Sequence, residues 1–139
     1  MDTLAGLRRW IAAILLLGMS GTFVELLLIR HVEDTIQLLP IVLLAGGAAA
    51  VAWHAWSRSV PSAIMVRGLM LLFVIAGALG IFFHFEANLE FQRELDATLK
   101  GRTLYWRALS ATVPPGLAPG VMIQLGLLGL AYTYRLKER

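Results

Sequence analysis

Four long apolar runs constrain this chain more than any other feature of its sequence. They cover residues 10–29, 37–56, 64–85 and 117–134, and each is 18 to 22 residues long. The hydrocarbon core of a bilayer is about 30 Å thick, and a helix of about 20 apolar residues crosses it. Lipid offers no hydrogen-bond partners to an open backbone, so helices are expected. The sequence therefore predicts an all-α integral membrane protein with four transmembrane helices in one membrane domain.

The composition is typical of a membrane protein, and it excludes several kinds of functional site. Of the 139 residues, 58% are hydrophobic and 15% are charged, whereas about 25% of an average soluble domain is charged. The chain has no cysteine, which excludes disulfides, thiolate metal sites and a cysteine nucleophile. It also lacks the Gly-Lys-Ser/Thr phosphate loop and the Gly-x-Ser-x-Gly elbow. We therefore expect a protein that is not an enzyme and that carries no cofactor.

The positive charges indicate an orientation. More Lys and Arg residues lie on the side of both chain ends than on the other side, where Glu and Asp balance most of them. Because cytoplasmic loops are enriched in Lys and Arg, we expect both ends in the cytoplasm of a bacterial inner membrane. The net charge of +3 needs no nucleic acid to explain it, and we expect membrane lipid as the partner of these basic residues. Aromatic residues are expected as interface anchors: Trp10, Trp53, Trp56, Tyr132 and Tyr134 inside, and Trp106 outside.

The connection between the third and fourth runs, residues 86–116, is long enough to hold structure of its own. Apolar residues recur there at every fourth position, at Phe91, Leu95 and Leu99. This spacing predicts an amphipathic helix that continues the third span and stops at Gly101. Residues 103–111 predict a second short helix. We expect these helices to form an extracytoplasmic cap, either a passive connector or a docking surface or lid.

Weak internal symmetry relates the two halves of the chain. A His-x-Glu triplet ends the first and the third runs, at residues 31–33 and 84–86. With Pro40 aligned to Pro119, Gly47 matches Gly126. The pattern is consistent with a tandem repeat of a two-helix hairpin and equally with chance similarity between apolar segments.

Small residues predict close contacts between helices. In lipid, helices associate mainly by van der Waals packing through small side chains. Glycines occur in every run: Gly18 and Gly21, Gly46 and Gly47, Gly77 and Gly80, and Gly120 and Gly126. The four helices can use these faces for one another, or the faces can bind other membrane subunits or a second copy.

Glu25 is the one acid inside an apolar run, and an ionisable residue at membrane depth is a functional hypothesis by default. Its spacing from Gly18, Gly21 and Thr22 places it on the predicted contact face. Gln124 lies in the fourth run at a comparable depth, so the two polar side chains could meet in the outer leaflet. The alternative is a purely structural hydrogen bond between helices.

Histidines and acids collect at the outer ends of the predicted helices. Histidine with carboxylates can bind zinc or another divalent metal, or carry protons. The candidates are His31, Glu33, His84, Glu86 and Glu90. Haem fits poorly, because none of the histidines lies in the middle of a span. The plain alternative is that these residues only hydrate the helix ends.

Three functional hypotheses remain. We favour an accessory or scaffold subunit that packs against other membrane helices. A small transporter or ion-handling protein would use Glu25 and the outer His/Glu residues. A metal- or haem-binding redox subunit is the third hypothesis.

Overall fold

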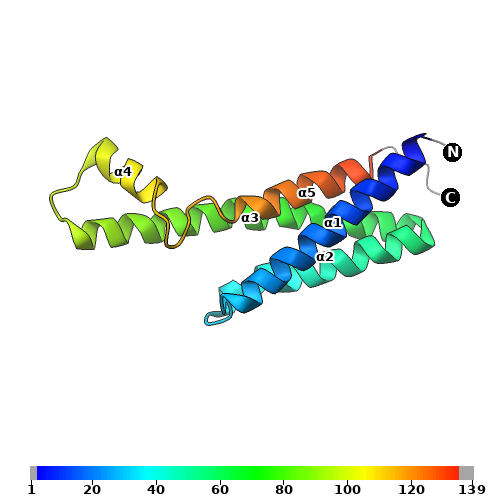
Figure 1. Cartoon of the computed structure of the whole chain (residues 1–139), viewed down its shortest axis with the longest axis horizontal. Helices are drawn as coiled ribbons and strands as arrows, with labels where there is room; N and C mark the ends of the chain where they lie inside the picture. Colours follow the sequence, from blue (N-terminus) through cyan, green and yellow to red (C-terminus); the bar gives the residue numbers. More distant parts are fainter. Residues whose placement is uncertain (1–2, 135–139) are drawn as a thin grey trace.

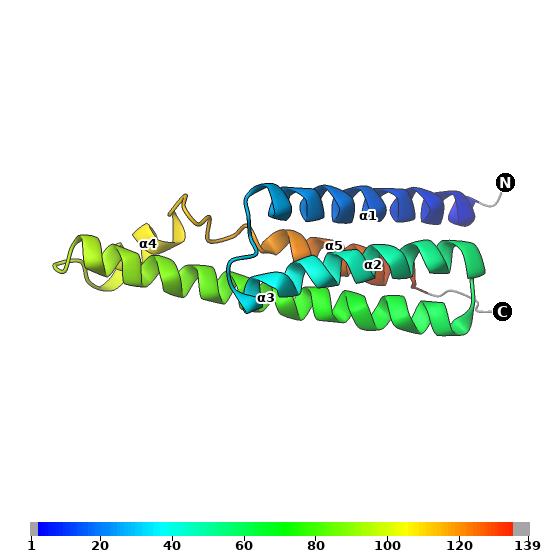
Figure 2. The ribbon, with the colours of Figure 1, turned by 90° about the horizontal axis from the view of Figure 1, so that it is seen from below.

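The computed structural model describes residues 3–134, and within this range the chain is built from helices and contains no strand (Figures 1 and 2). The helices follow in the order α1 (Thr3–Leu28), η1 (Thr35–Gln37, a 3-10 helix), α2 (Leu38–Ser57), α3 (Val60–Leu95), α4 (Gly101–Leu109) and α5 (Gly120–Tyr132). Three segments are long and apolar enough to cross a membrane, namely α1, η1 with α2, and α3. The all-α class is thereby confirmed, and a membrane protein is supported.

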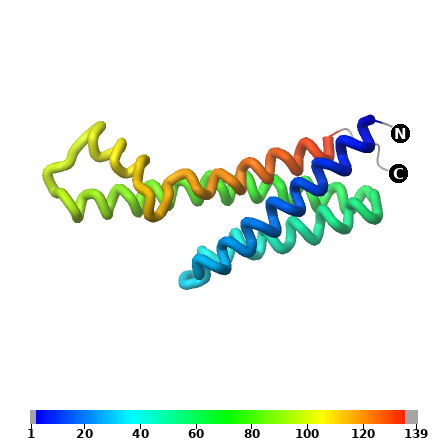
Figure 3. The backbone as a smooth tube through the Cα atoms, viewed as in Figure 1, coloured from blue at the N-terminus to red at the C-terminus, as the bar shows by residue number. Residues whose placement is uncertain are grey.

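The helices pack as two pairs. α1 lies along α2 and α5 lies along α3, while α2 also contacts α3 and α1 also contacts α5. Figure 3 shows the α1–α2 pair crossing the α3–α5 pair and moving away from it toward the connection between α1 and α2. The start of α1 and the end of α5 lie together, because Arg8 Nη2 donates a 3.1 Å hydrogen bond to the carbonyl oxygen of Tyr134. We call this the terminal end of the bundle.

The main core lies where the two pairs cross. Its fully buried side chains come from α1, α2 and α3: Leu15, Met19, Leu44, Val51, Val66, Met70 and Phe73. Gly47 makes room for Phe73, since a Cβ at position 47 would lie 2.8 Å from Phe73 Cζ. Gly126 also faces Phe73, and a Cβ there would lie 2.7 Å from the carbonyl oxygen of Met70. Close backbone approach through glycine therefore holds α2 and α5 against α3.

Local sequence signals account for the tight turn between α2 and α3. α2 ends at Ser57, and Arg58 takes the left-handed conformation with φ 50°. Ser59 then caps α3, because its side chain accepts a hydrogen bond from the backbone N–H of Ser62. Pro61 lies in the first turn of α3, where a missing N–H costs no helical hydrogen bond.

The third helix is longer than the apolar run that predicted it. α3 has 36 residues and continues beyond Phe85 to Leu95 without interruption. Its end differs from our expectation, because Asp96 caps it and Leu99 falls in the connection. Gly101 does not stop this helix; it takes φ +56° as the first residue of α4, so that prediction is wrong.

The fourth apolar run is helical over a shorter range than expected. α5 has 13 residues and begins at Gly120, after the turns that hold residues 117–119. It counts as a shorter apolar helix, so a fourth crossing is not established by length. Pro119 immediately precedes α5, whereas Pro40, its partner in the repeat alignment, lies within the first turn of α2.

Candidate functional site

The end of α3 that lies away from the chain termini and the returning α4 form a helical hairpin away from the main core, which we call the outer hairpin (Figure 1). A small second core holds it together, with Leu89 of α3 buried against Leu104 and Ala108 of α4. The rings of Phe85 and Tyr105 stack, with centroids 6.2 Å apart and 14° between their planes. These contacts fix α4 on α3.

Two side chains of α3 bind the connection that follows α4. Asn88 Nδ2 donates a 3.0 Å hydrogen bond to the carbonyl oxygen of Pro114. His84 Nδ1 lies 3.0 Å from the carbonyl oxygen of Pro115 and donates to it, since a carbonyl can only accept. Asn88 is fully buried, and its Oδ1 has no partner among the described residues. The connection is thus tied to α3 before α5 begins.

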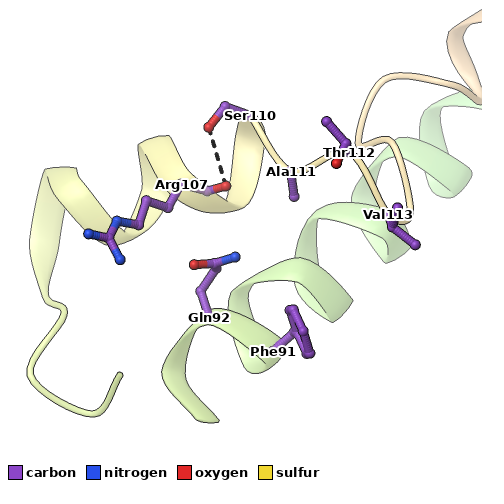
Figure 4. Close-up of a pocket in the computed structure, with 7 residues that line it drawn as sticks. All are labelled: Phe91, Gln92, Arg107, Ser110, Ala111, Thr112 and Val113. Atoms are coloured by element: carbon purple, nitrogen blue, oxygen red, sulfur yellow. Dashed lines mark hydrogen bonds between the residues drawn. The ribbon is translucent and has the colours of Figure 1, made fainter. Parts of the chain in front are cut away.

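A cleft of about 380 Å³ lies between α3 and the end of α4 (Figure 4). Its lining residues are Phe91, Gln92, Arg107, Ser110, Ala111, Thr112 and Val113. Figure 4 shows the Gln92 amide directed toward α4. Ser110 Oγ donates to the carbonyl oxygens of Trp106 at 2.8 Å and of Arg107 at 3.4 Å. One guanidinium, one amide and two hydroxyls beside three apolar side chains suit binding, and the lining contains no carboxylate or imidazole for proton transfer.

The turn between α3 and α4 is organised by Asp96. Its Oδ1 accepts hydrogen bonds from the hydroxyl of Thr98 at 2.6 Å and from the backbone N–H of Thr98 at 3.0 Å. These two bonds, with Arg107 nearby, lower the pKa of the Asp96 carboxyl below its usual value. Asp96 therefore stays ionised and partly balances the charge of Arg107.

Glu25 and Gln124 are both exposed, and no hydrogen bond joins them within the described residues. Thr22 is half-buried. Glu25, expected on the contact face of α1, has an exposed side chain and is not packed between helices of this chain in the described range. Gly18 packs against Leu125 of α5, but α5 begins only five residues before Leu125, at Gly120. Glu25 lies seven residues beyond Gly18 on α1, so α5 does not extend far enough along α1 to reach it.

The predicted glycines take different places. Gly18, Gly47, Gly77, Gly80 and Gly126 lie in close contact with other helices or with Pro119. Gly21 and Gly46 have no neighbour within 4 Å of a Cβ built there, and Gly120 has one at 3.9 Å. The first group serves packing inside this chain, and the second leaves parts of α1 and α2 open.

The outer His and Glu residues do not gather around one point. His31 lies near His84, and burial together with that histidine lowers the pKa of His31. Glu33, Glu86 and Glu90 are exposed. Over residues 3–134, no group of three or more His, Asp or Glu side chains is placed to hold a metal ion.

Sequence reasoning missed a buried polar cluster at the terminal end. His54 Nδ1 lies 2.7 Å from Ser62 Oγ, and both residues are buried. Ser57 and Ser59 place their hydroxyls 3.0 Å and 3.1 Å from Ser62 Oγ. The signal was present in the sequence as one histidine and three serines on the two sides of a tight turn. Tyr132, expected as an interface anchor, packs its ring edge-on against His54 in the core instead.

The other aromatic anchors are exposed at both ends of the molecule, as Trp10, Trp53, Trp56, Trp106 and Tyr134. At the terminal end, Arg67 Nη2 donates a 2.9 Å hydrogen bond to the carbonyl oxygen of Thr133, next to the Tyr134 carbonyl bound by Arg8. Two guanidinium groups therefore bind the first two carbonyls after α5, beside the helix C-terminus, where the helix dipole favours positive charge. No protein-family model, curated protein or solved structure matches the chain.

Proposed function

We propose that the chain crosses the membrane four times, with both ends on the cytoplasmic side of a bacterial inner membrane. At 1.5 Å per residue, α5 supplies about 20 Å of the ~30 Å that a crossing needs. The turns before it supply the rest, since Gly120 N–H donates to Leu117 O at 2.9 Å and Ala118 N–H to Pro115 O at 3.2 Å. Pro119 packs against Gly77 and Gly80, so α3 covers this irregular backbone.

The function that this geometry supports best is that of a non-catalytic accessory subunit, which docks another membrane protein through the outer hairpin. The length of α3 carries this proposal. Its 36 residues extend about 54 Å, which exceeds a hydrocarbon core by about 24 Å. The excess lies at the end away from the termini, where α4 folds back on it (Figure 2).

Apolar side chains remain exposed on the outer hairpin. Phe91 is 50% exposed, and Val113, on the other wall of the cleft, is 80% exposed. Beyond the hydrocarbon core lipid does not cover such residues, and exposed apolar patches there are typical of protein contact sites. Arg107 is the charged residue in the lining. A partner segment that places an acidic side chain beside an apolar one would complement both features.

The two other hypotheses receive less support. Transport through Glu25 and the outer His/Glu residues would need these side chains to lie close together, and over the described residues they do not gather around one point. A redox subunit requires a ligand set, and the outer histidines and glutamates provide none over the described residues. The open faces at Gly21 and Gly46 are further places where a membrane helix of the partner could pack.

The experiment is site-specific photo-crosslinking in intact membranes. A photoreactive residue at Val113 should give a discrete adduct with one other membrane chain, and the same residue at Ile75, an exposed position in the apolar part of α3, should not. Arg107→Glu should abolish the Val113 adduct while the protein remains in the membrane. Equal adducts at both positions, no adduct at all, or an adduct with a second copy alone would overturn the proposal.

A further inference from the structure

Glu25 lies in the apolar part of α1 with its side chain exposed. At 1.5 Å per residue it is about 24 Å along the helix from Arg9, which is within the ~30 Å of a hydrocarbon core. Its carboxyl group has no hydrogen-bond or ion-pair partner among residues 3–134, and Arg30, just beyond the end of α1, does not pair with it. The described range begins and ends at the terminal end of the bundle, which is the opposite end of α1 (Figure 2).

An exposed acid at this depth is unusual for a helix that packs only within its own chain. Ionisable side chains in membrane helices almost always face a bundle interior and pair there with another polar group. α5 covers this side of α1 at Gly18, where a Cβ would lie 2.8 Å from Leu125 Cδ2. Glu25 follows Gly18 by about two turns on the same side, and α5 does not reach it. The bundle of the single chain is therefore incomplete around Glu25.

Glu25 also borders a continuous exposed face of α1. Exposed residues recur there at spacings of three and four, which places them along one side of the helix. They are Leu17, Gly21, Val24 and Leu28. We call these four residues with Glu25 the α1 face. The opposite side of α1 is buried in the main core through Leu15 and Met19, and Figure 2 shows α1 along one edge of the bundle.

The α1 face permits close approach of a second helix and specifies its chemistry. A Cβ built at Gly21 has no neighbour within 4 Å, so a helix backbone can approach there. Gly21 lies one turn from Glu25, and a helix packed on the glycine brings its own side chains to the carboxyl group. The side chains that complement a carboxyl group by charge are Lys and Arg.

We propose that the α1 face binds a membrane helix of another protein, which places a Lys or Arg beside Glu25. Each of these side chains is costly alone in lipid, and pairing offsets part of that cost for both helices. In a symmetric dimer of this chain the two copies of Glu25 would lie at the same depth, so a second copy would add another acid there. This inference rests on the proposed function as an accessory subunit, and it adds a contact that does not use the outer hairpin.

The test is photo-crosslinking in intact membranes, with the photoreactive residue at Leu17. It should give an adduct with an apolar segment of another chain, and mass spectrometry of the adduct should find Lys or Arg in that segment. Glu25→Gln should lower the adduct yield about tenfold, a typical factor for losing a polar contact between membrane helices. Glu25→Asp keeps the carboxyl group and should retain most of the yield.

The matched control is Glu33→Gln, which removes an exposed acid beyond the end of α1 and should leave the yield unchanged. Equal amounts of each variant in the membrane fraction show that the substitutions leave the protein inserted. Charge reversal gives the sharpest result. Glu25→Lys should abolish the adduct, and replacement of the partner's basic residue by Glu should restore it in that variant.

Four outcomes would overturn the proposal: an adduct with lipid or with a second copy alone, no adduct, a crosslinked segment without Lys or Arg, and equal yields from the Glu25→Gln and Glu33→Gln variants. The probe at Val113 reports on the outer hairpin separately. An adduct at Val113 without one at Leu17 would overturn the contact at the α1 face alone. An adduct at Leu17 without one at Val113 would overturn docking through the outer hairpin and leave the α1 contact standing.

Discussion

His54 Nδ1 and Ser62 Oγ lie 2.7 Å apart and join α2 to α3 just before and just after the turn between them. Both side chains are buried. Tyr132 of α5 packs edge-on against His54, with ring centroids 5.6 Å apart. Because buried polar groups persist in folded proteins when they are hydrogen-bonded, this pair fixes the register of three helices at the terminal end.

Ser62→Ala should destabilise the fold. The substitution removes the hydroxyl that bonds His54, Ser57 and Ser59 and leaves the buried imidazole with one partner fewer. Loss of a partner for a buried polar group costs about 1–3 kcal/mol. Reversible unfolding in mixed micelles measures the effect. Ser20→Ala, at an exposed position on α1, is the control, and an equal effect of the two would contradict the role of the pair.

Gly126→Ala should destabilise, whereas Gly46→Ala should not. A methyl at position 126 would lie 2.7 Å from the backbone oxygen of Met70 and 2.8 Å from Val74 Cγ2, so α3 and α5 would have to separate. Such overpacking costs about 1–3 kcal/mol. At position 46 nothing lies within 4 Å, and alanine in a helix is better than glycine by about 0.5–1 kcal/mol.

The same unfolding measurement tells whether a glycine face packs against another helix of this chain or against another molecule. If Gly126→Ala were as stable as wild type, the contact between α3 and α5 would be looser than described. If Gly46→Ala kept monomer stability and lost a partner in the membrane, its open face would be an external contact. A stability loss at Gly46 in the isolated monomer would contradict the assigned open face.

The positions of the long helices could be predicted from apolar runs, but the end of α3 could not. Lipid demands an apolar surface, and a run therefore ends where the membrane ends. A helix ends where residues of low helix propensity follow or where a capping residue satisfies its last carbonyls. Residues 86–95 include good helix formers and no proline or glycine, so α3 continues to Leu95 and stops at the Asp96 turn.

The site residues were harder to predict, because they depend on which helices meet at each depth. Glu25 follows Gly18 at helical spacing, but α5 starts too far inward to face it. Spacing within α2 gave no sign that His54 has a polar partner, since that partner, Ser62, lies on α3. Pairing across a turn is a tertiary property, which the spacing within either helix does not contain.

Acidification should destabilise the chain partly through His31. Burial and the neighbouring His84 lower the pKa of His31 below its usual 6.5. The unfolded chain therefore binds a proton more readily, and this contribution to stability is complete above pH 6.5 and is lost as the pH falls below that value. His31→Gln should reduce the loss of unfolding free energy between neutral and mildly acidic pH.

Nuclear magnetic resonance titration of His31 checks the cause directly. The folded wild type should titrate below 6.5. His84→Gln removes the neighbouring charge and keeps an N–H donor for Pro115, so the pKa of His31 should rise in this variant. A pKa of His31 that stays unchanged would assign the shift to burial alone, and a pKa above 6.5 in wild type would contradict the description of both histidines.

Leu104→Ala should loosen the outer hairpin and leave the bundle intact. Leu104 is buried with Leu89 and Ala108 in a core that is separate from the one around Phe73. Removing a buried leucine side chain costs about 2–5 kcal/mol, and here that cost falls on the attachment of α4 to α3. Hydrogen exchange should therefore accelerate in Gly101–Leu109, while the middle of α3 stays protected.

A matched variant on the exposed side of α4 separates this effect from a general one. Leu109→Ala removes a 43% exposed leucine from the same helix and should change exchange little. If Leu104→Ala accelerated exchange equally in α3 and α4, the hairpin and the bundle would unfold as one unit. Because α3 runs through both cores, that outcome would mean that the docking proposed for the hairpin is coupled to helix packing in the bundle. Acceleration confined to α4 would instead show that the hairpin opens independently of the bundle.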